Sequence, residues 1–190
     1  MILEVLQYGH PVLRQKGARI AAITPEIQKL IEDMYETMRA AKGVGLAAQQ
    51  IGRALQLTVI DVRGATDRPS TIQINGKEAD VAASMPLVLI NPEIKPAADT
   101  EAGTEGCLSF PEIFGEVKRA GKADVSAMNA KGETIQFRCG GLLARAVQHE
   151  LDHLNGILFI DRMSRAEREE LKPKLEELQA KTKAALKAAK

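Results

Sequence analysis

The feature that most constrains the fold is the segment 141–155, which combines an apolar helical face with the motif HELDH at 149–153. Helix residues four apart lie one above the other, so both imidazoles can reach one cation. Glu150 lies about 100° around the helix from His149, beside such an ion, where a general base is needed. The rest of this face is aliphatic, with Leu142, Leu143, Val147, Leu151 and Leu154. We expect a core helix whose buried polar groups need partners, and a metal ion supplies one.

Two histidines do not complete a catalytic metal site, which generally has three protein ligands and one open position. The candidates for the third ligand are Cys107, Cys139 and acidic residues that follow His153. Gly106 stands directly before Cys107 and permits a close backbone approach. Cys139 precedes two glycines at the end of an expected strand and fits a buried small thiol better than a ligand.

Hydrophobic periodicity and turn residues predict an α+β fold. Thr24 and Pro25 mark the start of an amphipathic helix over 25–41. A third helix begins at Ser164, and Pro173 is expected to kink or break it. Strands are expected over 55–62, 87–90, 113–119, 123–128 and 133–138, with a long connection over 64–85. Antiparallel strands should thus surround a central metal-binding helix, with one helix on its N-terminal side and one on its C-terminal side.

The length of 190 residues suits one domain, with a catalytic part over 1–163 and a charged helix over 164–190 that belongs to it. A net charge of +1 and the absence of tryptophan argue against a nucleic-acid binder. No apolar run reaches the roughly 18 residues of a membrane helix, and no signal-peptide pattern is present. We expect a cytoplasmic monomer without membrane contact, whose two cysteines form no disulfide.

Three segments resemble the signature motifs of the peptide deformylase family and occur in the same order: GVGLAAQQ at 43–50, EGCLS at 105–109 and QHELDHLNG at 148–156. The resemblance spans nearly the whole chain, including VLQYGHPVLR near its start and ILFIDR after the histidine motif. It implies that Cys107, His149 and His153 hold the metal ion. Three motifs in the family's order argue against a chance match.

The resemblance also implies the roles of other residues. Glu150 corresponds to the catalytic acid and base, while the side-chain amide of Gln50 and the backbone N–H of Leu108 correspond to oxyanion donors. The implied reaction removes the formyl group from the formylmethionine of nascent chains. The implied metal is Fe(II), and Zn, Ni or Co can replace it. The residues implied in substrate binding are Val44, Gly45, Gly106, Leu142, Arg145 and Ala146.

Further expectations concern charged residues near these motifs. The stem of Arg145 should line the methionine pocket while its guanidinium reaches the rim. Glu105 and Arg119 are expected to form a bidentate pair that supports the Cys107 loop, although two unrelated surface charges would fit the same sequence. The lysine-rich tail, KTKAALKAAK at 181–190, is either a solvated helix end or a contact to ribosomal RNA.

Two other functions fit parts of the sequence. A zincin-type metallopeptidase would use a downstream glutamate as third ligand, and Glu167, Glu169 and Glu170 lie at about the right distance. A non-catalytic metal-stabilised protein would need the ligands alone. It would not require Glu150 and Gln50, both of which are present.

Overall fold

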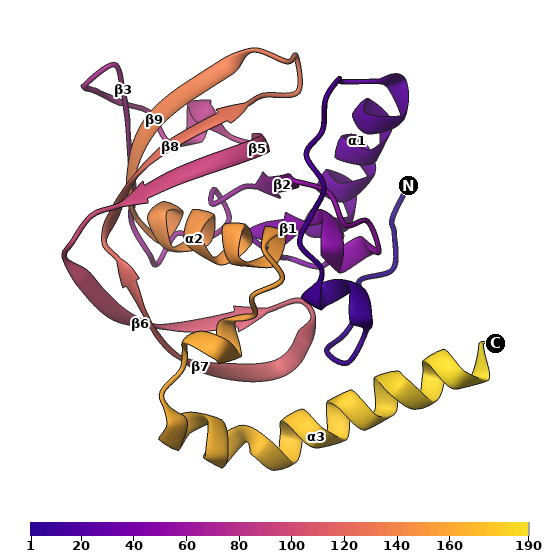
Figure 1. Cartoon of the computed structure of the whole chain (residues 1–190). Coiled ribbons are helices and arrows are strands. Elements are labelled where there is room, and N and C mark those ends of the chain that lie inside the picture. Colours follow the sequence, from indigo (N-terminus) through magenta and orange to yellow (C-terminus); the bar gives the residue numbers. More distant parts are fainter. Residues whose placement is uncertain (190) are drawn as a thin grey trace.

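The computed structural model describes residues 1–189, in which antiparallel strands combine with three α-helices (Figure 1). The α-helices are α1 (Pro25–Ala40), α2 (Leu142–Leu154) and α3 (Arg165–Ala188). Short 3-10 helices lie before and between these elements: η1 (Pro11–Arg14), η2 (Ala48–Ile51), η3 (Ala82–Ser84) and η4 (Phe159–Arg162). Among these residues, no helix has both the length and the apolar character needed to cross a membrane.

The strands form two antiparallel sheets, which confirms the expected mixture of helices and antiparallel strands. The larger sheet has the order β1-β2-β5-β8-β9-β3-β4. Its strands are β1 (Gly45–Ala47), β2 (Leu57–Ile60), β5 (Leu87–Pro96), β8 (Lys122–Met128), β9 (Thr134–Gly141), β3 (Ser70–Ile74) and β4 (Lys77–Ala79). The smaller sheet pairs β6 (Thr100–Cys107) with β7 (Phe110–Ala120). The long 64–85 connection thus contains the β3–β4 hairpin, which turns at Asn75 and Gly76, both at positive φ.

Helix α2 lies between the two sheets (Figure 1). Its inner residues pack in a core cluster with side chains from β2, β5, β8 and β9 of the larger sheet. The 64–85 connection holds its N-terminus, since Pro69 O accepts the N–H of Leu142 at 3.0 Å and Ser70 Oγ accepts that of Leu143 at 3.0 Å. These acceptors satisfy two of the N–H groups that a helix start leaves unpaired.

Helices α1 and α3 lie on the outside of the molecule, whereas α2 lies between the sheets (Figure 1). Helix α1 begins as expected, because Thr24 Oγ1 accepts the N–H of Ile27 at 3.3 Å and Pro25 occupies the first turn. Helix α3 buries Leu175 in a cluster with residues of η1, β7 and η4. Of the kink or break expected at Pro173, the break is wrong, because α3 continues across this residue. Pro173 is exposed, so water can bind the carbonyl group that loses its helical partner.

Candidate active site

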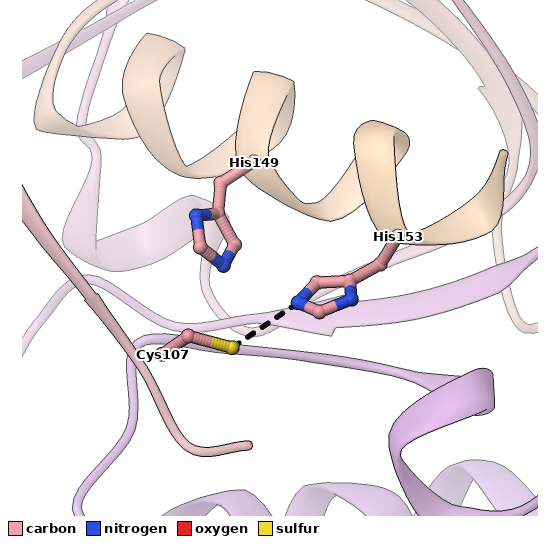
Figure 2. Close-up of side chains that lie close together, drawn as sticks. All are labelled: Cys107, His149 and His153. Carbon is pink, nitrogen blue, oxygen red and sulfur yellow. Dashed lines mark hydrogen bonds between the residues drawn. The ribbon is translucent and has the colours of Figure 1, made fainter. Parts of the chain in front are cut away.

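Cys107, His149 and His153 converge between the smaller sheet and α2. Cys107 is the last residue of β6, and the two histidines project from one face of α2 toward it (Figure 2). Cys107 Sγ lies 3.3 Å from His153 Nε2, and one ligand atom of each residue lies within 4.8 Å of the others. A thiolate and two imidazoles at this separation form a donor set that suits Zn²⁺ or Fe²⁺.

The surroundings of the two imidazoles also fit a bound cation. His149 Nδ1 lies 2.9 Å from Glu105 Oε1, a contact that orients the ring and leaves Nε2 for a metal ion. His153 is buried, and its Nδ1 has no hydrogen-bond partner within residues 1–189. Burial and the neighbouring His149 lower the pKa of His153 well below its ordinary value. The neutral ring keeps a lone pair for a cation.

Glu150 is buried beside the ligand set without belonging to it. Its Oε2 has no hydrogen-bond partner in the described chain, and burial raises the pKa of Glu150 to about 7. Gly45 of β1 packs against this carboxylate so closely that a Cβ there would lie 2.2 Å from Oε1. A carboxyl group with a pKa near neutrality can both accept and return a proton.

The carboxamide of Gln50 is held in a defined orientation. Its Oε1 accepts the N–H of Ala47 at 2.9 Å, so Nε2 points toward Ser109 Oγ at 3.2 Å and Cys107 Sγ at 3.5 Å. Leu108 follows Cys107 directly, and its side chain packs over Gly43, where a Cβ would lie 2.7 Å from Cδ1. Of the two expected oxyanion donors, the amide of Gln50 therefore lies beside the sulfur atom of Cys107, and Leu108 is the next residue along the chain.

These residues line one cavity of about 550 Å³, which opens between β1, the β6–β7 sheet and α2. Every site residue expected from the sequence lines it except His153, which is buried beneath. Sequence reasoning assigned no role to several other residues of the same cavity: Lys42, Arg68, Phe110, Pro111, Glu112 and Phe114. Pro111 is the second residue of β7, and the charged residues Lys42, Arg68 and Glu112 carry no local signal of a site.

A buried network of charges supports the ligands. Nε and Nη2 of Arg119 donate hydrogen bonds to Oε2 and Oε1 of Glu105, both at 2.9 Å, and these form the bidentate pair expected from the sequence. Asp152 receives Nη1 of Arg119 at 2.5 Å. Burial alone would raise the pKa of Glu105, but hydrogen bonds from His149 and Arg119 outweigh it and hold that pKa well below its usual range. Glu105 is therefore a permanently charged support for His149.

The expected position of the Arg145 guanidinium at the rim is wrong. Arg145 is only 5% exposed, and its Nη1 donates to Glu105 Oε2 and to Val117 O, both at 2.8 Å, while Nη2 donates to Glu101 O at 3.0 Å. Gly103 provides the space, because a Cβ there would lie 2.9 Å from Arg145 Cζ. With a buried carboxylate as its partner, this charge need not reach water.

The glutamates of the metallopeptidase alternative lie elsewhere. Glu167 accepts the N–H of Glu116 at 2.8 Å near the start of α3, and Glu169 and Glu170 are exposed on that helix. Cys139 is buried in β9 with its Sγ 3.6 Å from Ala123 O. In the described part of the chain, the group able to hold a metal ion is the one containing Cys107.

The profile of the family described as polypeptide deformylase matches residues 2–169. The chain belongs to this family. It is 44% identical to the peptide deformylase of Methylacidiphilum infernorum over 178 residues, 94% of this chain and 93% of the relative. It is 43% identical to that of Opitutus terrae over 189 residues, 98% of each chain. Among solved peptide deformylases, that of Synechococcus elongatus in complex with actinonin is 41% identical, with a TM-score of 0.77 over 90% of this chain and 87% of the other.

Proposed function

We propose that the cavity between β1, the β6–β7 sheet and α2 is a deformylase active site. The protein is a peptide deformylase by family, a hydrolase that removes the N-formyl group of nascent polypeptides as formate. The observation that carries the assignment of the site is the convergence of Cys107, His149 and His153 with Glu150 and Gln50 in one cavity. A purely structural metal site would require neither a buried carboxylate without a partner nor an oriented amide.

Cys107 Sγ and the two imidazoles are the proposed ligands of one divalent metal ion. Such an ion supplies a Lewis acid, which lowers the pKa of a water molecule and polarises a carbonyl oxygen. We propose Fe(II) as the physiological metal, with Zn, Ni or Co able to replace it. The thiolate of Cys107 suits each of these borderline metals.

Glu150 is the proposed acid and base. Its carboxylate accepts a proton from water as the water oxygen bonds to the formyl carbon, and it returns that proton to the nitrogen as the C–N bond breaks. The products are formate and a free N-terminal amine. The Nε2 of Gln50 and the N–H of Leu108 donate hydrogen bonds to the formyl oxygen as negative charge develops there. One such donor is typically worth about 3–4 kcal/mol of transition-state stabilisation.

The substrate peptide is proposed to bind across the cavity. Strand β1 is an edge of the larger sheet, so Val44 and Gly45 offer backbone groups to an extended peptide, and Gly106 offers them from the opposite side. Leu142, Ala146 and the stem of Arg145 form the proposed wall for the methionine side chain.

The wider assignments are proposals as well. We assign residues 1–163 to the catalytic part and 164–190 to a charged helix of the same domain, in a monomer that acts on nascent chains in the cytoplasm. Lys181, Lys183 and Lys187 are exposed on α3 and are proposed to contact ribosomal RNA phosphates; Lys190 lies outside the described residues.

Formate release from formyl-Met-Ala-Ser by Fe(II)-loaded protein, prepared without oxygen, tests the proposed function. We expect one equivalent of formate per free amine, with a Cys107→Ala variant losing both the metal and the activity. The matched control is Cys139→Ala, which removes a thiol outside the cavity and should keep the metal content. Formate release that is unchanged in Cys107→Ala would contradict the proposed site.

A further inference from the structure

Arg68 is a charged residue at the mouth of the active-site cavity that the proposed chemistry does not use. It lies in the 64–85 connection, lines the cavity and is exposed. Its Nη1 donates to Thr104 O on β6 at 3.3 Å. Within residues 1–189 its Nε and Nη2 have no acceptor and the guanidinium forms no ion pair. Its side-on edge, the one that binds a carboxylate with two parallel hydrogen bonds, is therefore free.

The backbone that carries Arg68 is fixed to the catalytic helix. The next residue, Pro69, accepts the N–H of Leu142 through its carbonyl, and Ser70 accepts that of Leu143 through Oγ. Ser70 also pairs with Gly141 at the edge of β9. The first turn of α2 thus anchors the two residues that follow Arg68. The hydrogen bond to Thr104 adds a second anchor from β6, so the guanidinium is held beside the cavity although it is exposed.

The charges around the cavity differ between its interior and its mouth. Inside, Arg145 pairs with Glu105, which also binds Arg119, and Glu150 is a second carboxyl group in the lining, so among the described residues the interior holds no unpaired arginine. At the mouth, Lys42, Arg68 and Glu112 are exposed, which leaves one net positive charge there. A carboxylate on a bound peptide would meet a free guanidinium at Arg68, whereas an ammonium group would be repelled by it.

We propose that Arg68 is a specificity-determining residue that favours formylated peptides with a carboxylate in the residues after methionine. This inference rests on the proposed function. Arg68 is too exposed for a strong ion pair, so the preference should be modest and should weaken in salt. It should affect KM rather than kcat, because the contact lies outside the reacting groups.

The test uses C-terminally amidated tripeptides in which only one charge changes. Formyl-Met-Glu-Ala and formyl-Met-Gln-Ala form one pair, and formyl-Met-Ala-Glu and formyl-Met-Ala-Gln form the other. In each pair, kcat/KM for the Glu peptide is divided by that for the Gln peptide. We expect a ratio of roughly two to five in at least one pair at low salt, falling toward one at 0.5 M NaCl.

Variants then assign the preference to one residue. In Arg68→Gln the ratio should fall to one, and in Arg68→Lys part of it should remain. The control is Arg63→Gln, which removes an arginine that is paired with Asp61 and does not line the cavity; its ratio should match that of the parent. A ratio of one in the parent for both pairs, or a ratio unchanged in Arg68→Gln, overturns the inference. The Gln peptides report separately on the proposed function, which fails if they release no formate.

Discussion

Nη1 of Arg145 lies 2.8 Å from Oε2 of Glu105 in the interior of the protein. The other oxygen of the same carboxylate lies 2.9 Å from Nδ1 of His149. One residue of the cavity wall and one proposed metal ligand therefore share a single carboxylate. Since a buried charge that loses its partner is strongly destabilising, a disturbance at Arg145 should reach His149 through Glu105.

Gly103→Ala tests whether Arg145, the residue of this network farthest from the proposed metal ligand, can be disturbed. The new Cβ would lie 2.9 Å from Arg145 Cζ, so the guanidinium must shift, and we expect its buried hydrogen bonds to weaken. We expect the free energy of unfolding, measured by urea denaturation, to fall by about 1–3 kcal/mol. Gly64→Ala is the control, because a Cβ there meets no atom within 4 Å. Equal stability of the two variants would show that the buried hydrogen bonds of Arg145 survive the added methyl group, so that no disturbance starts from Arg145.

Glu150→Gln should separate metal binding from turnover. The amide keeps the size of the side chain but cannot accept a proton from water, so we expect kcat to fall at least 10²-fold. Metal content, measured by plasma emission spectroscopy, should remain at the parent level. Glu93→Gln, on the exposed face of β5, serves as control and should keep both. Near-normal turnover in Glu150→Gln would show that another group takes the proton.

Gly45→Ala should impair the reaction by displacing the same carboxylate. A Cβ at this position would lie 2.2 Å from Glu150 Oε1, and a displacement of about 1 Å can reduce turnover by roughly 10²-fold. Formate release by the metal-loaded variant measures the effect, and Gly64→Ala again controls for the added methyl group. The idea is wrong if Gly45→Ala retains the kcat of the parent.

The two thiols should differ in reactivity in the folded, metal-free protein. Burial raises the pKa of the Cys139 thiol to about 12, so almost none of it is thiolate at pH 8. Cys107 lines the cavity and is partly exposed. We expect iodoacetamide at pH 8 to alkylate Cys107 first, and Cys139 only after denaturation, as followed by peptide mass spectrometry. Equal labelling of both cysteines in the native protein would contradict this.

Replacing Lys181, Lys183 and Lys187 by glutamine should weaken ribosome binding without changing the chemistry. The substitutions remove positive charge while leaving Leu175, which anchors α3, in place. We expect less protein to co-sediment with ribosomes at low salt and unchanged formate release from formyl-Met-Ala-Ser. If co-sedimentation is unchanged, the proposed contact with ribosomal RNA is wrong, and the tail is a solvated helix end.

The sequence predicted best the elements whose signals are local. The bounds of the expected helices over 25–41 and 141–155 lie within one residue of those of α1 and α2, because helical periodicity, and in α1 the Thr24 cap, act within a few residues. Strand β6 was missed, since Thr100–Cys107 has little β-branched content and is held by its pairing with β7. The break considered at Pro173 does not occur, because the exposure of this residue, which depends on tertiary packing, makes an interior proline tolerable.

The same contrast holds for the site. The three motifs predicted which side chains share the cavity, since their order along the chain resembles that of a known family. The direction in which the Arg145 side chain points was not predictable, because the groups that accept its hydrogen bonds lie 28 to 44 residues away in sequence. Arg68 was missed for a related reason. Its place depends on the pairing of β3 with β9, which no local pattern in the 64–85 connection indicates.

The guanidinium of Arg145 occupies the space beside Gly103 that a side chain at position 103 would need. This predicts which residue pairs should occur at the two positions in related proteins. A Cβ at position 103 would lie 2.9 Å from Cζ and Nη2 of Arg145, so a side chain there would require the guanidinium to move from its present place. A relative with a shorter aliphatic residue at 145 would have room for a side chain at 103, whereas a relative with the arginine in this place would favour glycine at 103. Positions 103 and 145 should therefore change together during evolution, although they are 42 residues apart along the chain.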